Sequence, residues 1–344
     1  MSAPEPDRRV FLNHATRALA GVIGTHVTAR VGGWGPKIQA VMGLRGGDAR
    51  RRVLAALRIA IVDTRGVAAG STSSRPLTTF GMGVDLGMDE AARAATLLGG
   101  AIELVSRVSG ARDAIGLIER ERLSVVISAA SPDETAELGD AAARHGVALL
   151  NASATDDGLR NARCARHTFH VAASDAMRTD AQRLWSAGAS HPAPRADGGE
   201  VVLWDARLDR FGAAQLNARF ESRFHQPMDS DAWAGWFAVK VAWEASQRAK
   251  AVDGGAVAVY LERDATQFDG QKGVPLSFRG WDHQLRQPLY VRERAQRPET
   301  PSSTGAEADR GAEPTPVPPS NTEASRTALD SLGTSEQAST CRWS

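Results

Sequence analysis

Small hydroxyl side chains follow two apolar runs of this chain that are typical of buried strands. Ser131 comes directly after SVVISAA, and Ser153 and Thr155 flank Ala154 at the end of VALLNASAT. These hydroxyls, together with the backbone N–H of Ala154, could hydrogen-bond a small polar ligand without blocking its approach. Ser and Thr ahead of Asp-Asp-Gly are also ordinary helix-cap and turn residues. The pattern therefore predicts either a ligand site or capped turns.

The signatures of common enzyme sites are missing from the sequence. The loop after the first apolar run contains Gly66 and Gly70 but no G-x-G-x-x-G, and no G-x-x-x-x-G-K-[ST], G-x-S-x-G or H-E-x-x-H occurs. His167 and His170 in HTFHV have no carboxylate or cysteine partners at a metal-ligand spacing. We therefore expect no metal, no cofactor and no enzyme activity.

Composition excludes further classes of protein. The 344 residues are 42% apolar and carry a formal net charge of +1, so no overall field attracts nucleic acid or an anionic membrane. No run of about 18 apolar residues occurs, which predicts that the chain has no permanent transmembrane helix. The length allows two domains or one large one.

The N-terminal residues contain a possible export signal. Arg8 and Arg9 directly precede VFL and a weakly apolar stretch that ends in small residues. This order is similar to a twin-arginine export signal, with a suitable cleavage site near Ala29. A basic, unstructured N-terminus is the alternative, because charged side chains interrupt the apolar stretch. We expect a periplasmic protein in which residues 1–52 are the export signal and a loose linker.

The C-terminal residues 295–344 are rich in Pro, Ser, Thr, Glu and Gly and contain few large apolar side chains. Such a segment cannot bury enough surface to offset its chain entropy, so a disordered tail is predicted. Cys341 lies in this segment, and the other cysteine of the chain is Cys164. We therefore expect neither a disulfide framework nor a zinc site.

Between the two ends, strand-like apolar runs alternate with helical patterns. The strand-like runs are 54–63, 101–108, 124–130 and 147–154. The helical patterns between them are 79–98, 111–123 and 131–146. This alternation predicts an α/β fold with a parallel sheet that helices cover on both faces. Ligands of such sheets bind at the carboxyl ends of the strands, where Ser131 and Ser153 would lie.

Two further patterns lie beyond residue 230. Trp233, Trp236 and Phe237 recur at helical spacing, and such a stripe is more typical of a core than of a ligand contact. Residues 274–291 alternate apolar side chains around a turn at Gly280, which predicts a hairpin.

Several stretches resemble a known family. GMGVDLGMDEAARAATLLGGAIELV and LLNASATDDGLRNARCARHTFHVAASDAMRTDA resemble the first lobe and the crossover of type I periplasmic binding proteins, the leucine/isoleucine/valine-binding class of ABC-transporter receptors. QLNARFESRFHQPMDSDAWAGWFAVKVAWEA and FDGQKGVPLSFRGWDHQLRQPLYV are similar to a branch found with pyrroloquinoline-quinone (PQQ)-dependent alcohol dehydrogenase systems. Together these stretches cover most of residues 54–292.

The resemblance implies two hinged lobes that close on a small polar solute, amino-acid-like or related to alcohol oxidation. Residues 53–166 would form lobe 1, and residues 167–294 a lobe 2 that contains the return crossing and the hairpin. Lobe 1 of the family binds ligand through hydroxyls and backbone N–H groups at the ends of its third and fourth strands. These positions match four residues here: Ser131, Ser153, Ala154 (by its backbone) and Thr155. The implied partners are the membrane subunits of an ABC transporter.

The sequence departs from the family pattern after the first helix of lobe 2. Residues 186–200 are rich in Ala, Gly and Pro and lead almost directly to the return crossing, so a large part of lobe 2 is expected to be absent. The alternative function is therefore that of a truncated receptor fold with a structural or interaction role and no small-molecule ligand. An exposed sheet edge in such a fold would also favour self-association.

Overall fold

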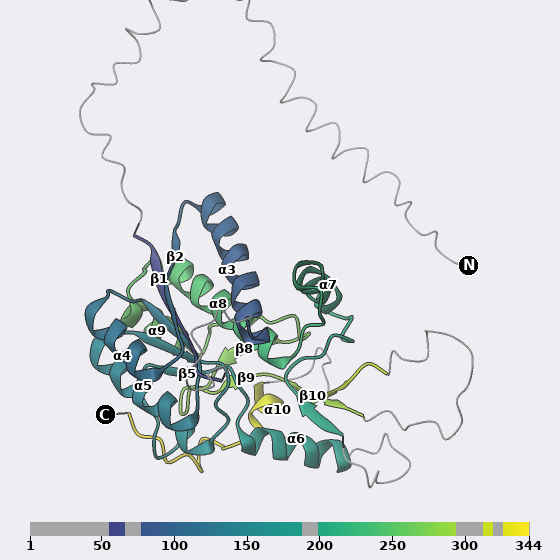
Figure 1. The fold of residues 1–344 in the computed structure, drawn as a ribbon. Helices are drawn as coiled ribbons and strands as arrows, with labels where there is room; N and C mark the ends of the chain where they lie inside the picture. Colours follow the sequence, from purple (N-terminus) through teal and green to yellow (C-terminus); the bar gives the residue numbers. More distant parts are fainter. Residues whose placement is uncertain (1–54, 66–76, 188–198, 294–311, 319–325, 344) are drawn as a thin grey trace, which may run out of the picture. The chain divides into compact units, whose positions relative to one another are not determined.

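The computed structural model describes five ranges of the chain (Figure 1): 55–65, 77–187, 199–293, 312–318 and 326–343. The predicted export signal and linker, with Arg8, Arg9 and Ala29, lie outside the described residues. No helix within the described ranges is long and apolar enough to cross a membrane.

A parallel sheet of five strands, in the order β2-β1-β3-β4-β5, is the largest sheet of the described residues. Its strands are β1 (Leu57–Asp63), β2 (Ile102–Val108), β3 (Val125–Ala129), β4 (Ala148–Asn151) and β5 (Thr168–His170). All four neighbouring pairs are parallel, which confirms the predicted sheet. The third and fourth strands are buried along their whole length, as expected for a sheet that is covered on both faces.

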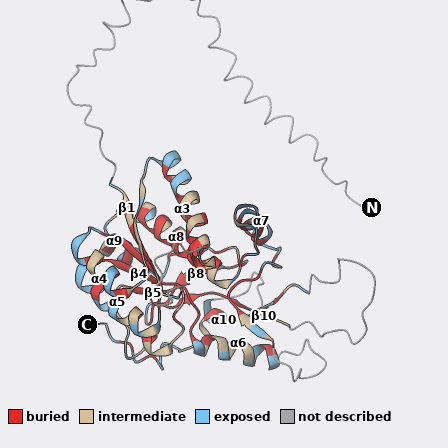
Figure 2. Ribbon diagram, in the orientation of Figure 1, coloured by how far each residue is buried: buried red, intermediate tan, exposed pale blue. Residues whose placement is uncertain are grey.

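Helices cover both faces of this sheet (Figures 1 and 2), as the sequence predicted. One face carries α3 (Thr79–Leu98), α8 (Ser230–Ala249) and α9 (Gly254–Leu261), and the other carries α4 (Ala111–Arg120) and α5 (Pro132–His145). Ile59 and Ile61 belong to the core on the α3 side, whereas Ala60 and Val62 pack with α4 and α5. The alternation follows from the two-residue period of a strand.

Helices α3 and α8 pack backbone against backbone. A Cβ atom on Gly83 would lie 1.9 Å from the carbonyl oxygen of Ala232, and one on Gly235 would lie 2.5 Å from that of Phe80. Trp233 and Phe237 of α8 are buried and their rings stack at 4.9 Å. The aromatic stripe is therefore part of the core, as predicted.

Two small antiparallel sheets follow the parallel one. The first has the order β11-β10-β6 and consists of β6 (Glu200–Val202), β10 (Leu289–Arg292) and β11 (Thr315–Val317). The second consists of β7 (Phe268–Asp269), β8 (Pro275–Phe278) and β9 (Leu285–Arg286). The predicted hairpin is therefore β8 with β9, and the chain beyond Pro288 leaves it to pair with β6 and β11.

The remaining described helices are α6 (Asp175–Ala187), α7 (Ala213–Phe224), α10 (Arg326–Asp330) and the 3-10 turn η1 (Asp157–Arg160). Only residues 188–199 separate α6 from β6. A strand-helix-strand unit needs about 30 residues. The chain therefore has no room between these two elements for further units of that kind, and the loss of much of lobe 2 stays a prediction.

The predicted disorder of the whole tail 295–344 was wrong. Residues 312–318 contain β11, and residues 326–343 contain α10 and a series of turns. Leu329 and Leu332 are buried. The segment is ordered because its few apolar side chains join a core that the rest of the chain supplies.

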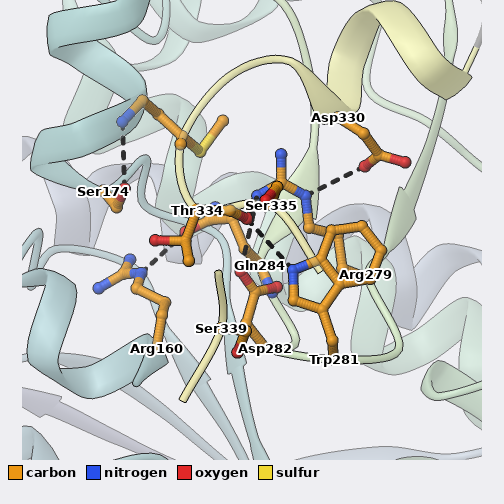
Figure 3. Close-up of polar contacts among 12 residues, drawn as sticks. Arg160, Ser174, Arg279, Trp281, Asp282, Gln284, Asp330, Thr334, Ser335 and Ser339 are labelled. Atoms are coloured by element: carbon orange, nitrogen blue, oxygen red, sulfur yellow. Dashed lines mark hydrogen bonds and ion pairs between the residues drawn. The ribbon is translucent and has the colours of Figure 1, made fainter. Parts of the chain in front are cut away.

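Ion pairs and hydrogen bonds also hold the C-terminal segment in place (Figure 3). The guanidinium of Arg279 lies 3.1 Å from the Asp330 carboxylate, and that of Arg286 lies 2.8 Å from it. The indole N–H of Trp281 donates to the carbonyl oxygen of Thr334 at 3.2 Å. These partners are distant in sequence, which is why the segment's own composition gave no sign of them.

The expectation that the chain has no disulfide framework was also wrong. Cys164 and Cys341 form a disulfide across a sequence separation of 177 residues. The ring of Trp343, two residues after Cys341, stacks on His283 at 4.3 Å. The pairing could not be predicted because it depends on the order of a segment that was expected to be disordered.

Gly83→Ala should lower the free energy of unfolding by about 1–3 kcal/mol, because the new methyl group would overlap the α8 backbone. Gly116→Ala in α4 is the matched control, since its Cβ would meet only the tip of the flexible Arg120 side chain. We expect the control to be neutral or stabilised by up to about 1 kcal/mol, as for Gly→Ala in helices. Urea unfolding checks both, and equal effects would contradict the close helix contact.

Cys341→Ser should lower the free energy of unfolding by about 2–5 kcal/mol, because the disulfide restricts the unfolded chain. Cys164→Ser should have the same effect, and the double variant should lose no more than either single one. Urea unfolding without reductant measures this. Unchanged stability in the single variants, or additive losses in the double variant, would show that the bond does not form.

Candidate functional site

The four predicted site residues line one open pocket of about 640 Å³. The pocket lies at the carboxyl ends of β1, β3 and β4, where a parallel sheet presents its ligand sites. Ser131, Ser153, Ala154 and Thr155 are joined there by residues that the sequence did not single out as ligands: Thr64, Arg65, Ser109, Ala130, Pro132 and Glu134. The structure therefore brings the predicted residues together.

Ser131 is exposed and caps α5. Its hydroxyl accepts a hydrogen bond from the Glu134 N–H at 3.4 Å, and its own N–H donates to Glu134 Oε2 at 3.1 Å. This reciprocal arrangement is a capping box. Ser131 is therefore a helix cap, and it also lies on the wall of the pocket.

Asn151 at the end of β4 shapes the turn that follows it. Its side-chain oxygen accepts the N–H of Ser153 at 3.2 Å and that of Ala154 at 2.9 Å, while its amide nitrogen donates to the Ala154 carbonyl at 2.8 Å. Ala154 is buried, and both its N–H and its carbonyl oxygen are hydrogen-bonded within the protein. The sequence prediction had assigned this backbone to a ligand.

Thr155 and Thr64 add two hydroxyls to the pocket wall. The Thr155 carbonyl accepts the N–H of Asp175 at 2.9 Å, and its hydroxyl has no hydrogen-bond partner among the described residues. Thr64 Oγ1 donates to Glu134 Oε2 at 2.8 Å. Thr64 directly follows the first strand, and that position was the signal by which it could have been found.

Glu134 supplies a negative charge to the pocket. Partial burial favours a higher pKa for this carboxyl, but hydrogen bonds from Thr64 and Ser131 outweigh it and the pKa is lowered. The carboxylate of Glu134 is thus ionised at neutral pH.

Arg65 is the cation of the pocket. Its guanidinium lies 2.7 Å from Asp231 at the start of α8 and 3.6 Å from Asp63, and it stands 5.4 Å over the ring of Phe80. Asp231 also lines a second open pocket of about 780 Å³, together with residues of α6, β6 and β10. The Arg65–Asp231 ion pair therefore lies where the two pockets meet.

Arg160 supports the turn that carries Ala154, one of the residues of the pocket wall. It is fully buried and donates to the carbonyl oxygens of Ala154, Asp156 and Ala172 at 2.9–3.0 Å and to the side chain of Gln284 at 2.8 Å. Burial lowers the pKa of Arg160 to about 10, so it remains charged at neutral pH. No sequence signal marked this residue, because its role depends on three loops that meet only in the fold.

Two buried histidines adjoin this arginine. His170 accepts a hydrogen bond from the Asn151 amide at 3.0 Å, and its pKa is lowered well below the ordinary value by burial and by the charge of Arg160. Burial lowers the pKa of His283 to about 3. His170 thus takes part in a structural network, and no group of three or more metal-binding side chains occurs within the described ranges.

Similar solved structures were found for this arrangement, although no family model and no curated protein matches the sequence. LivJ of Streptococcus pneumoniae, a branched-chain amino acid transporter substrate-binding protein in complex with isoleucine, is 14% identical with a TM-score of 0.53, and the match covers 69% of this chain and 95% of LivJ. A periplasmic binding protein from Burkholderia mallei is 13% identical with a TM-score of 0.59, over 83% and 98%. The chain has the fold of type I periplasmic binding proteins.

A third similar structure shows a different ligand on this fold. The solute-binding protein of an ABC transporter from Rhodopseudomonas palustris, in complex with 3,4-dihydroxybenzoic acid, is 10% identical with a TM-score of 0.53. The match covers 69% of this chain and 92% of that protein. LivJ is thus a substrate-binding protein of a transporter, and the Rhodopseudomonas palustris protein is a solute-binding protein of one. At this level of identity the comparison establishes the fold alone.

The two buried histidines predict that acid weakens the fold. Their pKa values are lowered in the folded state, so below about pH 6.5 the unfolded chain takes up protons that the native protein does not. The free energy of unfolding should therefore fall with decreasing pH, with a slope for each histidine that approaches about 1.4 kcal/mol per pH unit near pH 5. Urea unfolding between pH 6.5 and 5 measures this slope.

His283→Phe keeps a ring between Phe169 and Trp343 and should roughly halve the slope. His145→Gln changes an exposed histidine and serves as the control, with the slope of the unmodified protein. An unaltered slope in His283→Phe would contradict the neutral state of His283.

Proposed function

We propose that this protein is the substrate-binding component of an ABC transport system and that it binds a small polar solute in the pocket at the carboxyl ends of β1, β3 and β4. The observation that carries the proposal is the convergence of Ser131, Ser153 and Thr155 on one open pocket at this rim. The fold and the ligands of the similar proteins, isoleucine and 3,4-dihydroxybenzoic acid, support it. The proposed partners are the membrane subunits of the transporter.

The lobes are proposed to follow the sequence boundaries, with lobe 1 from 53 to 166 and lobe 2 from 167 to 294, extended by β11 and the disulfide-linked C-terminal segment. In such an arrangement the second pocket, lined by Arg178, Arg207 and Asp231, would lie on the side of the shortened lobe. The Arg65–Asp231 ion pair would then connect the two walls.

We also propose that the protein works in the periplasm. The disulfide between Cys164 and Cys341 supports this location, because such bonds persist in oxidising compartments. The twin-arginine signal at Arg8 and Arg9 remains a prediction. The link to PQQ-dependent alcohol oxidation rests on the resemblance of the segments 215–245 and 268–291.

A thermal-shift panel of amino acids, short alcohols, small carboxylates and PQQ tests the proposal. A ligand present at 100 times its Kd should stabilise the protein by about 2.7 kcal/mol, because it binds only the folded state. Ser153→Val should remove the shift if the ligand lies in the pocket at this rim. A stable, folded protein that none of these compounds stabilises would contradict the proposed function.

The second candidate is an interaction protein on a truncated receptor fold, without a small-molecule ligand. It is favoured by the strand β2, which forms an edge of the parallel sheet, and by the exposed side chains of Leu97, Leu98 and Leu104 beside it. Light scattering as a function of protein concentration separates the candidates. Self-association that Leu104→Lys abolishes, with no ligand response, would support this second function.

A further inference from the structure

Three of the hydroxyls that line the pocket, those of Thr64, Ser131 and Ser153, already donate their hydrogens within the protein. Thr64 Oγ1 and Ser131 Oγ both donate to Oε2 of Glu134 at 2.8 Å. Ser153 Oγ donates to the carbonyl oxygen of Ala130 at 3.1 Å. A hydroxyl has one hydrogen and two lone pairs. These three hydroxyls therefore offer only acceptor lone pairs to a ligand.

Three backbone donors of the same wall are engaged as well. The N–H of Ser131 donates to Glu134 Oε2 at 3.1 Å. The N–H groups of Ser153 and Ala154 donate to Asn151 Oδ1 at 3.2 and 2.9 Å. These N–H groups are the kind that would hold a ligand carboxylate at such a rim. Because these N–H groups are already hydrogen-bonded, this part of the wall offers a ligand more acceptors than donors.

The charges around the pocket also favour a ligand that donates hydrogen bonds. Glu134 lines the pocket as an only partly buried carboxylate. Arg65, the cation among the described lining residues, is paired with two carboxylates, those of Asp63 and Asp231. The two carboxylates balance the guanidinium charge, so the Glu134 carboxylate leaves an excess of negative charge at the pocket, which favours a cation.

We infer that this pocket binds a small organic cation through its primary ammonium group, with Glu134 as the counter-ion and the hydroxyl oxygens of Thr64 and Ser131 as hydrogen-bond acceptors. The inference rests on the proposed function, in that it assumes that the pocket at this rim is the solute site. An ammonium group has three N–H donors and no acceptor, which matches a wall of lone pairs. A carboxylate would meet those lone pairs and a negative charge.

Three probes that share a four-carbon skeleton separate the possible ligand classes: butylammonium, butyrate and 1-butanol. Isothermal titration of the full-length protein at pH 7.5 measures their affinities, with thermal shifts as a second readout. Butylammonium should bind and raise the Tm, whereas butyrate and 1-butanol should bind at least about tenfold more weakly, because a hydrogen bond to a charged partner is worth about 1.5–3 kcal/mol.

Glu134→Gln tests the counter-ion. Glutamine can still accept the hydrogen bonds of a capping box, so the variant should keep its fold and lose only the charge. We expect its affinity for butylammonium to fall about tenfold or more. Glu137→Gln, an exposed position of the same helix, is the matched control and should bind as the unmodified protein does.

The outcomes separate this inference from the proposed function. Butyrate or 1-butanol binding as tightly as butylammonium, or unchanged binding by Glu134→Gln, would overturn the cation site and leave a solute-binding protein of another specificity. Binding of other compounds of the wider panel, without binding of any of the three probes, would also overturn the cation site. If no compound of either set binds, the proposed function is contradicted together with the cation site.

Discussion

The buried guanidinium of Arg160 is the interaction on which the candidate site depends. It binds the carbonyl oxygens of Ala154 and Asp156 and thereby fixes the turn that carries Ser153 and Thr155. A charge without solvent costs several kcal/mol unless it is fully hydrogen-bonded. The carbonyls around Arg160 provide that compensation only in one arrangement of the loops, so the charge specifies their geometry.

The guanidinium of Arg160 also links distant parts of the chain. Arg160 binds Gln284, whose amide donates to the carbonyls of His170 and Ala172 at 3.1 and 3.0 Å. The loop after β4, the chain leaving β5 and the segment before β9 therefore meet in one buried polar network (Figure 3). In a two-lobed binding protein, such a junction would set where the lobes can pivot.

The sequence predicted the sheet and its helices because their signals are local. Apolar runs such as residues 124–130 and caps such as Ser131 and Gly146 mark strands and helix ends within a few residues. The rim position of the site followed from the parallel topology alone. The position of Thr155 was thus predictable, whereas the direction of each hydroxyl hydrogen was not.

What the sequence could not reveal depends on contacts between remote residues. Arg160 has no local partner pattern, and the two carboxylates around Arg65 come from different elements. The C-terminal segment was misjudged for the same reason, since Asp330 is held by Arg279 and Arg286 from the hairpin. Long-range electrostatic pairs leave no periodic trace in a sequence.

The bond between Cys164 and Cys341 closes a covalent ring that contains β5, both antiparallel sheets and α8. A single peptide cleavage anywhere within that ring leaves one molecule, whose two pieces separate only after a reductant is added. A nicked copy would therefore migrate as an intact one on a non-reducing gel. Apparent integrity of this protein under oxidising conditions says nothing about the continuity of its backbone between these two residues.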